Sequence, residues 1–133
     1  MATPRTALHL SRAEGRLFLS KAPRKSRYTV VPKEHRTIDG IVFASSAEAQ
    51  RYAALKLRER LGEISALGCQ VEFRCEVNGI HILNYAVDFA YREGDAQRYE
   101  EVKSWRSGAE KDWRIRRKLV EAIYGVKIDV VTI

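Results

Sequence analysis

The chain has 133 residues, with 24 lysines and arginines against 17 aspartates and glutamates, and a formal net charge of +7 at pH 7. This length suits one domain with a single core, and 45% hydrophobic with 31% charged residues excludes a disordered or collagen-like chain. No apolar run approaches the roughly 20 residues of a membrane span, and two cysteines are too few for a disulfide-stapled secreted domain. We expect a cytoplasmic protein without membrane partners.

The positive charge is concentrated at the two ends of the chain. Residues 1–40 carry nine basic and three acidic residues, and residues 101–133 carry eight and five. Residues 41–100 reverse the balance, with seven basic and nine acidic residues. The basic flanks suit a polyanion such as nucleic acid. The acidic middle suits either metal binding or a solvated surface, and charge alone does not decide between them.

We predict a basic N-terminal arm over residues 1–36 and a folded domain over residues 37–133. All three prolines lie in the arm, which lacks sustained hydrophobic periodicity. At most one short helical turn is expected, near residues 12–19. The arm's basic run is either a solubilising tail or a clamp on a DNA backbone, and we favour the clamp, made by Arg24, Lys25 and Arg27.

The predicted domain opens with a turn and a helix. Asp39-Gly40 is a turn signal before the short apolar run 41–43. Ser45 and Glu48 have the spacing of a capping box, and Gly62 is a C-terminal stop. We therefore expect a helix from Ser45 to about residue 61.

Three strands follow, over residues 69–77, 80–92 and 97–105. Asn78-Gly79 is the strongest hairpin signal in the chain, and Gly94-Asp95 marks a second turn. Along the second strand, large apolar residues alternate with smaller or acidic ones, which places one set on a single face: Tyr85, Val87, Phe89 and Tyr91.

A second helix and a last strand complete the chain. We expect the helix over about residues 108–124, because Ser107 and Glu110 repeat the capping-box spacing and Gly125 provides a stop. The alternating segment 126–133 reads as a strand. This order predicts an α/β (α+β) fold with a mixed central sheet flanked by helices.

A symmetric second hairpin places two acids opposite each other. If Glu93 pairs with Ala96, the numbers of paired residues sum to 189, so Asp88 pairs with Glu101 at a Cβ separation of about 4.5–5.5 Å. Such a pair needs compensation, either from Lys103 one pleat along or from a divalent cation held by oxygen ligands. Solvent-facing acids balanced by Lys103 are the simpler interpretation, but unpaired acids are rare in so apolar a strand. A one-residue bulge would separate the pair.

These residues resemble the PD-(D/E)XK nuclease superfamily. The motif reads Val87-Asp88 on the second strand and Glu101-Val102-Lys103 on the third, in an αβββαβ order, with Val87 where a proline is often found. A closer resemblance, over about residues 27–131, is to a small phage and prophage family long catalogued as a domain of unknown function, which is placed near resolvase-like nucleases. Its pattern is matched in several further stretches: residues 37–52, Gly62-Glu63-Ile64, residues 85–89 and Tyr124-Gly125.

The resemblance implies a restriction-endonuclease-like core and a magnesium-dependent endonuclease. Asp88 and Glu101 would hold Mg²⁺ or Mn²⁺ with the Val102 carbonyl, and Lys103 would orient or help activate water and offset charge on the scissile phosphate. Glu48 would complete the metal shell or support a second ion, or it would only cap its helix, and both the functional and the capping interpretation stay open. Bound metal supplies a nucleophile at neutral pH and stabilises charge developing on oxygen.

DNA contacts are expected from the second helix and the loop before it. Its basic residues recur at helical spacing, opposite Ile115, Leu119 and Ile123, and form either a solvated face or, as we favour, a track for the DNA backbone: Lys111, Arg114, Arg117 and Lys118. Trp105 is a candidate for stacking on an unpaired base, whereas Trp113 is expected in the core. Cys69 and Cys75 are expected to be structural.

By analogy with the fold, the expected substrate is branched or Holliday-junction DNA, cut by a homodimer in DNA recombination. The resemblance further implies a phage- or prophage-encoded protein of the bacterial host cytoplasm. A nicking or flap nuclease of the same fold is an alternative. A catalytically silent DNA-binding adaptor is another, and RNA stays possible because the motif does not read the sugar.

Overall fold

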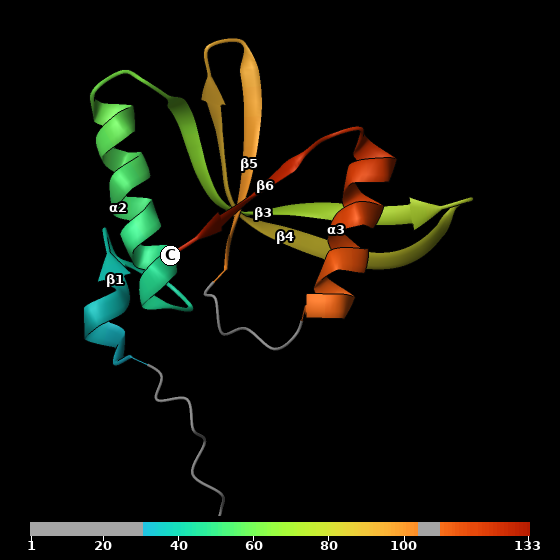
Figure 1. Ribbon diagram of the computed structural model, residues 1–133, viewed down its shortest axis with the longest axis horizontal. Coiled ribbons are helices and arrows are strands. Elements are labelled where there is room, and N and C mark those ends of the chain that lie inside the picture. The colour runs from blue at the N-terminus through green and yellow to red at the C-terminus, as the bar shows by residue number, and fades with distance from the viewer. Residues whose placement is uncertain (1–30, 104–109) are drawn as a thin grey trace, which may run out of the picture. The chain divides into compact units, whose positions relative to one another are not determined.

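The computed structural model describes residues 31–103 and 110–133 (Figure 1). Within them a 3₁₀ helix and a two-stranded hairpin precede the larger elements, which follow the predicted order of helix, three strands, helix and strand. The bounds are η1 Lys33–Arg36, β1 Thr37–Ile38, β2 Ile41–Val42, α2 Ser46–Arg60, β3 Ser65–Val77, β4 Ile80–Glu93, β5 Ala96–Lys103, α3 Glu110–Tyr124 and β6 Ile128–Thr132.

Several predicted features lie outside the described residues. These are the basic run of the arm, the helical turn near residues 12–19, the candidate stacking residue and the proposed cap of the second helix: Arg24, Lys25, Arg27, Trp105 and Ser107. The division of the chain at residue 37 stays a prediction.

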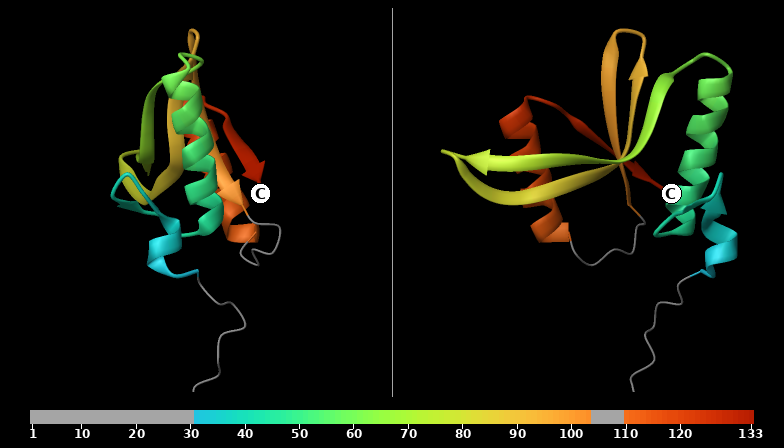
Figure 2. Two further views of the ribbon diagram at one scale, coloured as in Figure 1. Left: turned by 90° about the vertical axis from the view of Figure 1, so that its left-hand side faces the viewer. Right: turned by 180° about the vertical axis from the view of Figure 1, so that it is seen from behind.

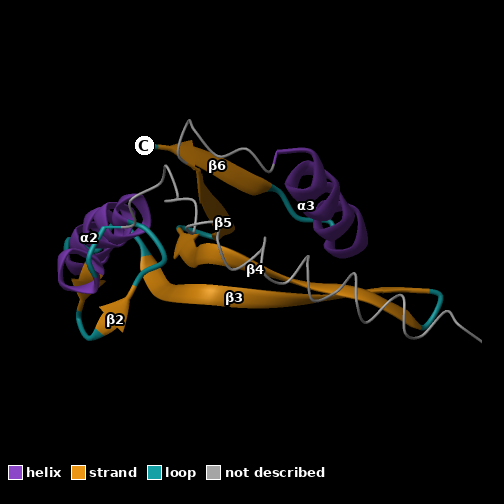
Figure 3. Cartoon of the chain, turned by 90° about the horizontal axis from the view of Figure 1, so that it is seen from below, coloured by secondary structure: helices purple, strands orange, loops and turns teal. Residues whose placement is uncertain are grey.

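The main sheet has four strands in the order β3-β4-β5-β6. The first three are antiparallel, and β6 is parallel to β5. Helices α2 and α3 lie on opposite sides of β5 and β6 (Figures 2 and 3). The fold is therefore of the predicted α/β class, with a mixed sheet flanked by helices, consistent with a restriction-endonuclease-like αβββαβ core.

Helix α2 has the predicted ends. The Ser45 Oγ accepts a 3.2 Å hydrogen bond from the backbone N–H of Glu48, which satisfies one of the open amides of the first turn. At the other end Gly62 has φ +77°, and the N–H of Glu63 donates to the carbonyl of Arg58 at 3.0 Å. This is the Schellman arrangement, and it explains why a glycine ends the helix.

The two hairpins set the register of the sheet. Asn78 and Gly79 both have positive φ, as a tight hairpin turn with the right-handed twist of strands requires. In the second hairpin the pairs run from Glu93 with Ala96 to Phe89 with Glu100, which confirms the predicted register. Strand β3 begins at Ser65, earlier than predicted, because an irregularity near Gly68 lets the chain pair with β4 further along.

The core consists of two clusters of buried side chains on β4 and its neighbours. One cluster gathers around α2 and includes Leu55, Phe89 and Tyr91. The other lies against α3 and includes Val87 and Val120. β3 and β4 change direction along their length (Figure 1). The side chains on one face of β4 therefore contribute to one cluster near one end of the strand and to the other cluster further along. Asp88 lies in β4 between Val87 and Phe89, where one cluster gives way to the other.

The packed face of α3 matches the prediction at Leu119, which packs against the second core cluster, and differs from it at Ile115 and Ile123. Ile115 is 66% exposed and Ile123 is 38% exposed, whereas Val120 is fully buried. Trp113 packs against the same cluster as Val120, and Arg117 lies one helical turn from each, so these three residues share a face. The helix is oriented so that the large indole ring of Trp113 packs against the core, and Ile115 is left exposed.

The two cysteines are not bonded to each other. Cys69, which is partly buried, and Cys75, which is buried, are both free thiols. They lie on β3 and pack with the two core clusters, in line with a structural role. None of the helices in the described parts of the chain is long and apolar enough to cross a membrane.

Candidate active site

Asp88 is held by hydrogen bonds from both neighbouring strands. Its Oδ2 accepts a 2.7 Å bond from the backbone N–H of Val102 on β5, and its Oδ1 accepts a 3.2 Å bond from Nε2 of Gln70 on β3. Only 8% of Asp88 is exposed. Burial raises the pKa of its carboxyl group, while these hydrogen bonds and the nearby Lys103 ammonium act in the opposite direction.

Glu101 is a buried carboxylate with one unsatisfied oxygen. Its Oε1 lies 3.5 Å from Nζ of Lys103, whereas its Oε2 is buried and has no hydrogen-bond partner among the described residues. Burial and the Asp88 carboxylate raise the pKa of Glu101 to about 7, although Lys103 and the Tyr85 hydroxyl lower it. At neutral pH this position therefore favours an added positive charge, either a proton or a cation.

Glu48 joins this group from α2. Its carboxyl group is about half buried, and its pKa is raised by burial and by the Asp88 carboxylate. The backbone of Ala44, the Lys103 ammonium and the Ser45 hydroxyl lower the pKa. The backbone N–H of Glu48 takes part in the helix cap by donating to Ser45 Oγ, and its carboxylate interacts electrostatically with Asp88 and Lys103. Asp88 and Lys103 therefore interact electrostatically with both Glu48 and Glu101, and both interpretations of Glu48 stay open.

A network on Glu100 holds α2 against β5. Arg51 donates two hydrogen bonds to the Glu100 carboxylate, at 2.8 and 2.6 Å, and the Tyr91 hydroxyl donates a third at 2.6 Å. Burial opposes ionisation of Glu100, but these bonds outweigh it, and its pKa is lowered. Glu48 and Arg51 are three residues apart and lie on the same side of α2, so the Arg51–Glu100 pair holds that side of the helix against β5.

Sequence reasoning missed the Glu100 network, although a signal exists. Glu100 and Glu101 are consecutive acids on a strand, where successive side chains point to opposite faces. Both are buried, so each must have its own compensation. The helix residue three positions after Glu48 is an arginine, which suits a buried carboxylate better than a lysine.

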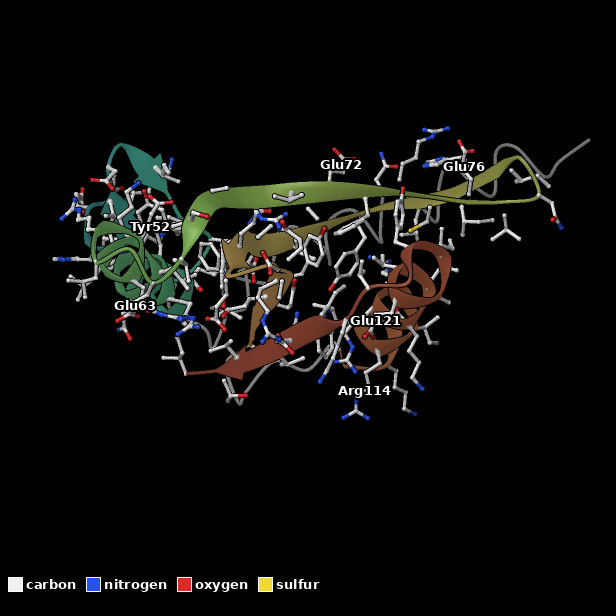
Figure 4. The ribbon with its side chains drawn as sticks, turned by 90° about the horizontal axis from the view of Figure 1, so that it is seen from above. Tyr52, Glu63, Glu72, Glu76, Arg114 and Glu121 are labelled. Atoms are coloured by element: carbon white, nitrogen blue, oxygen red, sulfur yellow. The ribbon has the colours of Figure 1, made fainter. Side chains whose placement is uncertain are left out.

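The basic residues of α3 do not all lie on one face. Lys111 and Lys118 are exposed, and Arg114 points away from the sheet in Figure 4. Arg117 is instead turned inward, with its guanidinium carbon 4.8 Å from the centre of the Trp113 ring. The exposed acids Glu72 and Glu76 point to the opposite side of the molecule from Arg114 (Figure 4).

The carboxylates of the candidate site provide some of the oxygen ligands that a hard cation such as Mg²⁺ requires. Within residues 31–103 and 110–133, no group of three or more His, Cys, Asp or Glu side chains is arranged to hold a metal. Asp88 and Glu101 nevertheless provide two adjacent carboxylates, and Oε2 of Glu101 is a buried oxygen without a partner in the described chain. Mg²⁺ is commonly bound by one or two carboxylates, with water and substrate phosphates completing the shell. The residues present therefore fit such an ion, and the Val102 carbonyl as a ligand stays a prediction.

A protein-family model matches residues 25–132, and so covers every helix and strand described above. Its description is "Protein of unknown function (DUF1064)". The chain belongs to this family. The expected membership of an uncharacterised family is thereby confirmed. Searches of the curated proteins and of the solved structures gave no match for this DUF1064 protein.

Proposed function

We propose that this DUF1064 protein is a metal-dependent endonuclease of the PD-(D/E)XK type that hydrolyses phosphodiester bonds in DNA. The observation that carries the proposal is the buried Oε2 of Glu101, which has no hydrogen-bond partner among the described residues. The other oxygen of the same carboxylate, Oε1, lies 3.5 Å from Nζ of Lys103, and Asp88 is a second buried acid beside it. Two acids buried side by side destabilise a fold unless a cation compensates them. A purely structural role does not explain why two buried acids stand next to each other at this position.

The four candidate catalytic side chains have different proposed roles. Asp88 and Glu101 hold Mg²⁺ or Mn²⁺ together with the Val102 carbonyl, and Glu48 supports this shell from α2. The ion, when bound, supplies a nucleophile at neutral pH and stabilises negative charge on phosphate oxygens. Lys103 orients the attacking water and offsets charge on the scissile phosphate. Hydrolysis leaves a 5′-phosphate and a 3′-hydroxyl.

The proposed substrate is branched DNA, including the Holliday junction, cut in recombination by a homodimer. Symmetric incision of a junction needs two active sites, and one chain provides one. The exposed basic residues of α3 supply contacts to the DNA backbone, which give affinity without sequence readout. A phage- or prophage-encoded protein acting in the host cytoplasm is part of the same proposal. The branched substrate, the homodimer and the phage origin are proposed from the resemblance to resolvase-like nucleases.

The test is cleavage of matched four-way junction, flap, linear duplex and single-stranded DNA, each with Mg²⁺, with Mn²⁺ and with EDTA. We expect cleavage that needs the metal, fastest on branched DNA. Lys103→Met should abolish it, whereas Lys127→Met, which changes a lysine that is 84% exposed in its side chain, should not. A preference for nicked or flap substrates would assign the protein to the nicking or flap nucleases.

A catalytically silent DNA-binding adaptor is the second candidate. It is favoured by one observation, namely that the described residues form no complete metal-binding group. Tight binding of the same DNA panel without cleavage under any metal would establish it. Cleavage of matched RNA in place of DNA would redirect the proposal to a ribonuclease.

A further inference from the structure

Trp113 contacts three other groups at the edge of the candidate site. Its indole Nε1–H donates a 2.9 Å hydrogen bond to the Tyr85 hydroxyl. The Lys103 ammonium lies over its ring, with Nζ 4.5 Å from the ring centre, and the Arg117 guanidinium lies at 4.8 Å. A single side chain of α3 thus contacts β4 and β5 next to the proposed metal-binding acids.

These contacts use both polar properties of an indole. The ring face attracts cations through its quadrupole, and two cations lie over it. The Nε1–H group can only donate, and it donates to Tyr85. A residue that served only to fill the core would need neither property, so the contacts of Trp113 go beyond packing.

The ammonium of Lys103 needs several contacts to stay in one position. A lysine is a point charge on a flexible four-carbon stem, and its 3.5 Å ion pair with Glu101 is longer than a direct charge-assisted hydrogen bond. The Trp113 ring provides a second contact, which limits where the ammonium can move. Arg117, itself paired with Glu121 at 3.5 Å, packs over the same ring and limits its movement in turn.

Tyr85 extends the same contact chain to Glu101. The Tyr85 hydroxyl accepts from Trp113 and influences the Glu101 carboxyl group, whose pKa it lowers. Burial and Glu101 raise the pKa of Tyr85 itself, so its hydroxyl keeps its proton and stays a donor. Trp113 is therefore linked to Lys103 through its ring and to Glu101 through Tyr85.

We infer that Trp113 is a positioning residue that holds the Lys103 ammonium beside Glu101. The catalytic consequence of this role rests on the proposed nuclease function, whereas the positioning itself does not. Trp113 belongs neither to the predicted motif nor to the predicted metal ligands, and it lies on α3, ten residues beyond the lysine that it contacts.

The positioning is tested by NMR on the full chain without metal or DNA. Trp113→Leu should remove the ring-current displacement of the Lys103 ε-protons, and Trp113→Phe, which keeps an aromatic face, should retain most of it. Tyr85→Phe should shift the Trp113 indole N–H resonance. The control is Tyr124→Phe, which removes a tyrosine hydroxyl on α3 that donates to the Arg74 carbonyl, and it should change neither signal.

The catalytic consequence is tested by cleavage kinetics of the same variants. We expect Trp113→Leu to lower kcat by up to about 100-fold, with KM for DNA changed by less than about twofold, and Trp113→Phe to restore most of the rate. Unchanged Lys103 resonances in Trp113→Leu would overturn the inference, and so would a loss in KM alone. If Trp113→Leu does not fold, Trp113→Phe and Tyr85→Phe decide by the same signals. A wild type that cleaves nothing would overturn the proposed function, while the NMR result would still decide the positioning.

Discussion

The backbone N–H of Val102 donates a hydrogen bond to Asp88 Oδ2 at 2.7 Å. Val102 separates Glu101 from Lys103 along β5, so the carboxylate on β4 is fixed to the middle of the Glu-X-Lys segment. The distance between the two halves of the motif is therefore set by strand pairing and by this one bond. Such fixation through the backbone is what a reactive centre requires of its supporting residues.

The first prediction concerns stability and pH. The Glu101 carboxyl has a pKa of about 7 in the fold against an ordinary value of 4.5. Between these values the folded protein keeps a proton that the unfolded chain has released, so the contribution of Glu101 to stability falls as the pH rises from about 4.5 to 7. Urea denaturation at pH 8 without metal should show Glu101→Gln more stable than wild type by on the order of 1–3 kcal/mol. At pH 4 the two should be alike.

Magnesium provides the control for this experiment. An ion that binds only the folded state stabilises it by mass action, so Mg²⁺ at pH 8 should raise the stability of the wild type and leave Glu101→Gln unchanged. A variant that is less stable than wild type at pH 8 would show that Glu101 is not electrostatically strained.

The second prediction separates the two roles of Glu48. Ser45→Ala removes the cap of α2 and should lower the free energy of unfolding by about 1 kcal/mol with little effect on cleavage. Glu48→Gln relieves the repulsion from Asp88, so we expect little loss of stability but at least about tenfold slower cleavage. Paired denaturation curves and cleavage rates measure both. A Glu48→Gln variant that is destabilised like Ser45→Ala but fully active would reduce Glu48 to a helix cap.

The third prediction tests the clamp between α2 and β5. Arg51→Ala leaves the Glu100 carboxylate buried with the Tyr91 hydroxyl as its one donor among the described side chains, and should cost about 3 kcal/mol of stability. Arg51→Lys should recover little, because an ammonium does not reproduce two parallel hydrogen bonds. The control is Arg74→Ala, which breaks an exposed pair with Glu76 and should cost less than about 1 kcal/mol. Equal losses at Arg51 and Arg74 would contradict the clamp.

The pairing of the candidate site could be predicted because turn chemistry sets the register. Gly94-Asp95 closes a hairpin whose pairs run unbroken from Glu93 with Ala96 to Phe89 with Glu100. Since side chains alternate along a strand, this register alone brings Asp88 toward Glu101. The ends of α2 were likewise predictable, because caps act through residues close in sequence.

Features that depend on distant contacts could not be predicted in this way. Gln70 has φ +51° within β3, and nothing around it in the sequence indicates that its amide meets Asp88. The packed face of α3 was predicted correctly at Trp113 and Leu119 but wrongly at Ile115 and Ile123. Helical periodicity marks Ile115 as apolar but does not show that the contact with the sheet lies on the side of Trp113. The Arg51–Glu100 pair joins residues 49 positions apart, beyond the reach of any local pattern.

The fourth prediction concerns the DNA-binding face. Lys111 and Lys118 are exposed on α3. A lysine that neutralises a DNA phosphate releases the counterions condensed on it. Replacing either by alanine should weaken binding of all DNA sequences alike and lower the slope of log K against log salt by about 1. Lys127→Ala, an exposed lysine between α3 and β6, is the control. Fluorescence anisotropy at several salt concentrations gives the slope, and an unchanged slope in both α3 variants would remove the helix from the interface.

The most direct test of the central claim is the rate at which Asp88→Asn cleaves the preferred DNA in Mg²⁺. The asparagine keeps an oxygen to accept the Val102 hydrogen bond but loses the negative charge. We expect a folded protein whose cleavage is slower by more than about 100-fold, while the turn variant Asp95→Asn cleaves like wild type. An Asp88→Asn protein that cleaves at the wild-type rate would show that these acids are not the catalytic centre.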